Sequence, residues 1–207
     1  MTLLRDRRFT AFHEACHAAM CLVTGCKIDK VVLYSSPVSG RGGVCEFRRC
    51  GRAASDAWVA LVAPVADSIK YGFNVTQCLQ HHGSEDFEFA LLVFEEAFFP
   101  PVPTQHKTWA QPGKSDVIAS VLELAEDNAS QVADRVQTAV RCQEAIDLAT
   151  RYAHCTVQQI IGYLQQESWF IPFAETLADE LARKGSLTGT EVISFALSSS
   201  DYHGPMP

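Results

Sequence analysis

Two histidines and a glutamate near the start of the chain have the spacing of a metal site. His13 and His17 are four residues apart with Glu14 between them, in the pattern HExxH. On a helix this spacing places both imidazoles on one face, one turn apart, where they can share one zinc ion. Glu14 is displaced around the helix, so it is expected to reach a zinc-bound water rather than the zinc. Zinc lowers the pKa of such a water to roughly 7, which predicts peptide hydrolysis with Glu14 as the general base.

The residues around this motif are apolar on almost every side of the expected helix. Phe12, Ala15, Ala19 and Met20 lie beside the three ionisable groups. A helix that merely happens to carry two histidines and a carboxylate is the alternative, but unpaired polar groups in an apolar setting are costly. A metal ion would give them a partner, so the setting favours the functional interpretation.

A catalytic zinc ion usually has three protein ligands and a water, so the chain must supply one more ligand. The extended zincin pattern places a third histidine six residues after the second, and Val23 stands there instead. The remaining candidates lie in one short segment, and residue types alone do not choose among them: His81, His82, Glu85, Asp86 and Glu88.

The rest of the pattern predicts a mostly α (α+β) protein with a small β-hairpin after the HExxH helix. Apolar periodicity and breaker residues predict the elements. The expected strands are 30–34 and 43–47, and the expected helices are 9–24, 55–71 with Ser55 as its N-cap, 85–99, two helices within 115–166, 172–184, and a last helix begun by the capping box of Thr188 and Glu191.

The length of 207 residues favours a single domain over 1–207. Within it, the proline-rich segment 100–113 is expected to be a loop, and the tail 198–207 is expected to be disordered.

Charge and composition limit the partners. The net charge of −7 argues against nucleic acid or anionic lipid as the main partner. No apolar run approaches the roughly twenty residues of a membrane span, and we find no signal peptide, so no membrane insertion and a cytoplasmic location are expected. Eight cysteines occur without a CxxC pair, which predicts reduced thiols rather than a cysteine-ligated structural zinc.

Four segments in the same order resemble the peptidase domain of the FtsH family of AAA+ zinc metalloproteases. Residues 12–44 (FHEACHAAMCLVTGCKIDKVVLYSSPVSGRGGV) resemble its HEAGHA helix, the following strand and a glycine-rich turn. Residues 51–71 are similar to its GGRAAEE helix, and residues 172–195 to its C-terminal helix pair. Residues 83–87 (GSEDF) are similar to its GASNDL stretch, whose Asp is the third zinc ligand. The resemblance therefore implies a zincin-like helical peptidase domain with Asp86 as the third ligand.

The resemblance also has gaps. Cys16 stands where the family has glycine inside the motif, and residues 93–166 match poorly. The family couples this peptidase to a membrane anchor and an ATPase module, and the 207 residues contain neither. We therefore expect an ATP-independent metallopeptidase that cleaves peptides or flexible, unfolded protein segments.

The remaining expectations concern the substrate, the oligomeric state and alternative functions. An extended substrate is expected to add to a sheet edge at Val31, Val32 and Leu33 or at Gly43 and Val44. Family members form rings, so a homo-oligomer stays open. The alternatives are a catalytically inactive zinc-binding regulatory module, a peptidase subunit fed by a separate ATPase, and a hydrolase of small amides.

Overall fold

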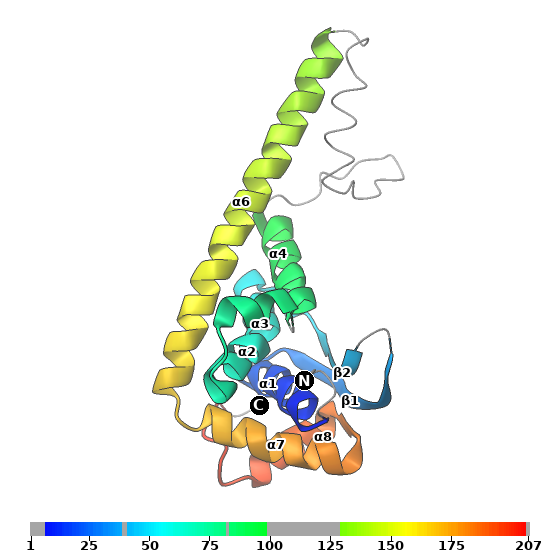
Figure 1. Cartoon of the computed structure of the whole chain (residues 1–207), viewed down its shortest axis with the longest axis vertical. Helices are drawn as coiled ribbons and strands as arrows, with labels where there is room; N and C mark the ends of the chain where they lie inside the picture. Colours follow the sequence, from blue (N-terminus) through cyan, green and yellow to red (C-terminus); the bar gives the residue numbers. More distant parts are fainter. Residues whose placement is uncertain (1–6, 39–40, 82, 99–128, 206–207) are drawn as a thin grey trace.

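Helices dominate the chain, and one small antiparallel sheet lies beside them (Figure 1). The computed structural model describes residues 7–38, 41–81, 83–98 and 129–205. This confirms the mostly α class with a small β element. The elements are α1 (Arg7–Thr24), β1 (Lys27–Val38), β2 (Arg41–Arg48), α2 (Ala53–Tyr71), α3 (Val75–His81), α4 (Ser84–Phe98), α6 (Ala129–Gln166), α7 (Phe170–Lys184), β3 (Ser186–Thr188) and α8 (Gly189–Ser198).

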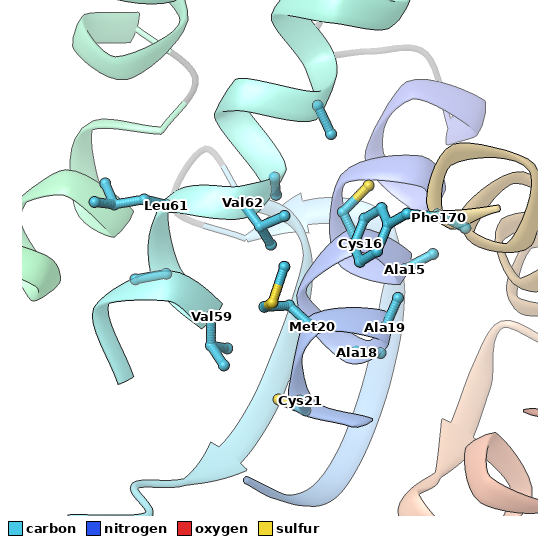
Figure 2. Packing of buried hydrophobic residues seen from close by; sticks show 14 of the residues in the cluster. Ala15, Cys16, Ala18, Ala19, Met20, Cys21, Val59, Leu61, Val62 and Phe170 are labelled. Carbon is cyan, nitrogen blue, oxygen red and sulfur yellow. The ribbon is translucent and has the colours of Figure 1, made fainter. Parts of the chain in front are cut away.

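α1 is the central helix of the core. Its small residues let two helices approach it closely: α2 lies along one side and α7, with Phe170, along the other (Figure 2). Ala15, Ala18 and Ala19 are fully buried, as is Met20, which faces α2. The predicted apolar, buried helix is therefore confirmed, and its end at Gly25 has the positive φ of 73° that glycine adopts without strain.

The sheet has the order β2-β1-β3, with both pairs antiparallel. The hairpin of β1 and β2 was predicted, with shorter strands, whereas β3 was not. β3 makes β1 the central strand, because Val31 and Val32 pair with Leu187 and Ser186, and the Leu33 N–H donates to the Gly185 carbonyl at 2.8 Å. The expectation that Val31, Val32 and Leu33 form a free substrate edge is therefore wrong. Within the described residues β2 pairs only with β1, so its outer side is an edge.

α2 begins two residues before the predicted start. Arg52, not Ser55, occupies the N-cap position, and its side chain makes no capping hydrogen bond. The buried carboxylate of Asp56 instead accepts a hydrogen bond from the Cys50 N–H at 2.9 Å, which fixes the approach of the chain to the helix. Pro64 lies inside α2, as expected, without ending it.

The part of the chain before the proline-rich segment differs from expectation, because a separate short helix, α3, precedes α4. After that segment the structure describes one helix of 38 residues, α6, inside the range 115–166 where two helices are expected. α6 extends beyond the rest of the described chain (Figure 1). The expected loop at 100–113 and residues 115–128 lie outside the described residues.

The C-terminal part is more ordered than expected. The capping box of Thr188 and Glu191 is confirmed at the start of α8. The tail was expected to be disordered, but the structure describes it as far as residue 205. The Tyr202 ring packs against the rings of Trp169 and Phe173, with centroids 5.1 and 4.9 Å apart. Among the described helices, none combines the length and apolar character that crossing a membrane requires.

Candidate metal centre

Three side chains from two helices converge at one point. His13 and His17 come from α1, and Asp86 comes from the first turn of α4. The two Nε2 atoms are 3.3 Å apart. Asp86 Oδ2 lies 3.1 Å from His13 Nε2, and Asp86 Oδ1 lies 3.5 Å from His17 Nε2. This group of three has the composition and closeness of a metal site.

α2 holds the other nitrogen of each imidazole. His13 Nδ1 donates to Asp67 Oδ2 at 2.6 Å, and His17 Nδ1 donates to the Val59 carbonyl at 2.6 Å. A carbonyl can only accept, so the Nδ1 of His17 must carry the proton, and we assign the Nδ1 proton of His13 in the same way because its partner is a carboxylate oxygen. In the neutral rings both Nε2 atoms therefore present lone pairs. This is the tautomer that a metal ion needs from two histidine ligands.

Among the described residues, no hydrogen-bond donor is found for these lone pairs. Two bare nitrogens face each other and the oxygens of a carboxylate, which is repulsive in a site this buried. Either a proton or a metal cation between them removes the repulsion. The donor set of two imidazoles and one carboxylate thus fits a cation.

The charges around the site favour positive charge at its centre. Burial alone would lower the pKa of His13, but the charges and hydrogen bonds of Asp67 and Asp86 raise it well above its ordinary value. The pKa of Asp86 shifts the other way: burial would raise it, but the two histidines lower it well below its usual range. The same carboxylates that stabilise an imidazolium also stabilise a bound cation.

Glu14 lies next to the cluster but is not a member of it. Its side chain is buried, and burial raises the pKa of its carboxyl although His13 and His17 oppose the shift. The backbone N–H of Cys45, on β2, donates to it. A carboxylate with a raised pKa beside the candidate metal ligands is suited to accept and release a proton.

Gly83 explains how Asp86 reaches α1. A β-carbon at this position would lie 2.7 Å from the ring of Pro64, so only glycine lets the start of α4 approach α2 so closely. The structure brings together His13, His17 and Asp86 as expected. Of the other candidates, Glu85 and Glu88 are exposed and outside the cluster, His81 ends α3, and His82 lies outside the described residues.

Asp67 is the functional residue that sequence reasoning missed. It is fully buried on α2, and within the described residues its second oxygen, Oδ1, has no hydrogen-bond partner. A buried carboxylate with one orphaned oxygen is costly, and the hydrogen bond to His13 is its visible compensation. The only sequence signal was an acidic residue in an otherwise apolar stretch, AWVALVAPVADSI.

Cys16, inside the motif, belongs to the core and not to the cluster. Its side chain is fully buried, and burial raises the pKa of its thiol well above the ordinary value. It therefore behaves as a small apolar residue.

Comparison with protein-family models and with curated proteins finds no match for this chain.

Replacing Asp86 with alanine is expected to weaken metal binding by more than about 100-fold, because one of three ligands is lost, and loss of an outer-shell partner alone costs 10- to 100-fold. Competition with a chelator, with Zn²⁺ as the test ion, measures the affinity. Glu88→Ala, an exposed acid on the same helix, is the matched control and should bind as the wild type does. Unchanged affinity in Asp86→Ala would remove Asp86 from the ligand set.

Replacing Asp67 with asparagine keeps the size but removes the charge that orients His13 and favours a cation. We expect metal affinity to fall roughly 10- to 100-fold. Asp56→Asn changes the other buried aspartate of α2, which does not contact the cluster. It should lower stability, and it should reduce metal affinity much less than Asp67→Asn does. Equal affinities for the two variants would contradict the orienting role of Asp67.

Proposed function

We propose that this protein is a zinc-dependent peptidase. The observation that carries the proposal is the convergence of His13 Nε2, His17 Nε2 and the Asp86 carboxylate, with Glu14 beside them. The resemblance of residues 12–44 to the HEAGHA segment of FtsH-type peptidases, and of residues 83–87 to its GASNDL stretch, supports the same conclusion. A zincin-like fold and action without ATP are part of the proposal.

The separations between donor atoms suit zinc. Zinc binds imidazole nitrogen at roughly 2.0–2.1 Å in tetrahedral geometry, which places two ligand atoms about 3.3 Å apart. The observed separations among the donor atoms are 3.3, 3.1 and 3.5 Å. Two histidines and a carboxylate are a common catalytic ligand set, which leaves one position for water or substrate.

Each residue has one task in the proposed reaction. A zinc ion held by His13, His17 and Asp86 would act as a Lewis acid, which would polarise the peptide carbonyl and lower the pKa of water. Glu14 takes a proton from the attacking water and passes it to the amine that leaves. Asp67 and the Val59 carbonyl hold the two imidazoles with Nε2 toward the centre. Burial of Glu14 keeps bulk water from competing for its proton.

The edge of β2 is the proposed substrate platform. A β-carbon on Gly43 would lie 2.9 Å from Glu14 Cγ, so this strand passes directly beside the general base. An extended peptide that pairs with Gly43 and Val44 would lie along the cluster, held by main-chain hydrogen bonds. This arrangement selects flexible segments, because a folded substrate cannot offer a free strand.

Three alternative functions are outcomes of the tests. A zinc-binding regulatory module without hydrolysis would need the ligands but not Glu14, and the buried carboxylate beside the cluster argues against it. A hydrolase of small amides would use the same residues but not the β2 edge. A peptidase fed by a separate ATPase would cleave an unfolded protein poorly until that partner was added.

The first test uses a fluorescent, permanently unfolded protein as substrate, without ATP. Glu14→Gln keeps the size and the ligands but removes the base, so cleavage should fall at least about 100-fold while zinc content is unchanged. Glu46→Gln, an exposed acid on β2, is the matched control and should cleave as the wild type does. Zinc binding without cleavage by any form would favour the regulatory module, and equal cleavage by wild type and Glu14→Gln would refute the mechanism.

The platform is tested on a short peptide that the wild type cleaves. Methylating one backbone nitrogen beside the cleaved bond removes a strand hydrogen bond, so we expect KM to rise roughly 5- to 10-fold with kcat largely retained. The same methyl group placed far from the cleaved bond is the control. A series in which methylation never changes KM would show that the substrate does not pair with β2.

A further inference from the structure

A second group of reactive side chains lies at the base of the β-hairpin. Cys26 immediately precedes β1, and Cys50 follows β2. The pairing of Lys27 with Arg48 brings the two ends of the hairpin together. The two sulfur atoms and a carboxylate oxygen of Asp56 all lie within 4.8 Å of one another. Both thiols are free.

Asp56 anchors this group. It is fully buried on the first turn of α2. Its Oδ1 accepts hydrogen bonds from the Cys50 N–H at 2.9 Å and from the Cys26 thiol at 3.6 Å, while Arg49 Nε donates to Oδ2 at 3.4 Å. One carboxylate thus fixes the positions of both cysteines. Hydrogen bonds, and not packing alone, hold the two side chains together.

The two thiols have different environments. Burial would raise the pKa of Cys50, but hydrogen bonds from the Arg52 N–H, the Cys26 thiol and the Arg52 guanidinium lower it. Burial raises the pKa of Cys26 to about 12. Cys50 is half-buried and Cys26 buried. The pair therefore consists of a half-buried thiol whose pKa is lowered toward the reactive thiolate form, and a shielded partner thiol.

A second metal site is the competing interpretation, and the charges disfavour it. Two sulfurs and one carboxylate would be three ligands, but the carboxylate already accepts hydrogen bonds from three donors. The guanidinium groups of Arg49 and Arg52 add positive charge beside the sulfurs. Positive charge repels a cation but stabilises a thiolate.

We propose that Cys26 and Cys50 are a peroxide-sensitive thiol pair that forms a reversible disulfide. The Cys50 thiolate attacks a peroxide oxygen: an S–O bond forms, the O–O bond breaks, and hydroxide leaves and takes up a proton as water. The sulfur of Cys26 then attacks the sulfenic acid on Cys50, an S–S bond forms, and the hydroxyl leaves with the Cys26 proton as a second water. Two thiols and one peroxide thus give one disulfide and two waters.

Oxidation of the pair is expected to affect α2, because the pair contacts the first turn of that helix. Asp56 lies on the first turn of α2, and Val59, whose carbonyl holds His17, follows one turn later on the same helix. A bond between the sulfurs requires them to approach to about 2.05 Å, which moves Cys50 relative to Asp56. The first turn of the helix that orients both histidines therefore senses the redox state of the pair.

The test is a time course of hydrogen peroxide on the reduced, full-length protein. Remaining thiols are alkylated, and the protein is digested without reduction for mass spectrometry. We expect a Cys26–Cys50 cross-linked peptide, reversed by dithiothreitol, to form at least about tenfold faster than oxidation of Cys155, an exposed cysteine outside this cluster. Because this comparison is made within the wild type, it does not depend on how any variant folds.

Variants then separate the roles. Cys26→Ser should leave a sulfenic acid on Cys50 that a dimedone reagent traps, and Arg52→Gln should slow cross-linking about threefold or more. Cys155→Ser is the control and should cross-link as the wild type does. Oxidation of Cys50 no faster than that of Cys155 would overturn the proposal. Loss of one equivalent of bound zinc in Cys26→Ser, with wild-type zinc in Cys155→Ser, would overturn it in favour of a metal site.

Discussion

The contact between α1 and α2 is the constraint on which the structure depends. The two helices share the core, where Met20 of α1 faces Val59 and Val62 of α2 (Figure 2). The same contact carries two imidazole hydrogen bonds, to Asp67 and to the Val59 carbonyl. The packing of these side chains and the two hydrogen bonds all require a fixed register between the helices. Any shift of α2 along α1 would therefore disturb both the packing and the direction of the two Nε2 atoms.

Because the polar groups of the site are fixed inside the core, they lower the stability of the folded state when no ligand is bound. His17, Glu14 and Asp67 are buried polar groups in a core of otherwise apolar side chains. Each such group costs roughly 1–3 kcal/mol when it lacks a partner, and Asp67 Oδ1 is already without one among the described residues. A ligand that binds only the folded state returns part of that cost as stability. Such a loss of stability is expected where a protein keeps functional polar groups inside its core.

The features predicted correctly from the sequence are local ones. The spacing of His13 and His17 sets their common face without reference to the rest of the chain, and the capping box of Thr188 and Glu191 spans three residues. The role of Asp86 as third ligand was predicted only from a family resemblance, because His13 and His17 are distant from it in the sequence. The Val59 carbonyl left no signal, because any residue type supplies a backbone oxygen. The predicted N-cap at Ser55 failed because Asp56 ties the incoming chain to α2 through Cys50.

The hairpin links the chemistry of both clusters. β3 occupies one side of β1, so the open edge of the sheet falls on β2, beside Glu14. The far end of the same strand leads to Cys50, whose N–H is held by the first turn of α2. One strand thus connects Glu14, the proposed substrate edge and the proposed thiol pair, and it contacts α1 as well. A covalent bond between Cys26 and Cys50 would tie the start of β1 to the chain that leaves β2. It would therefore restrict the motion of the strand that the proposed substrate would join.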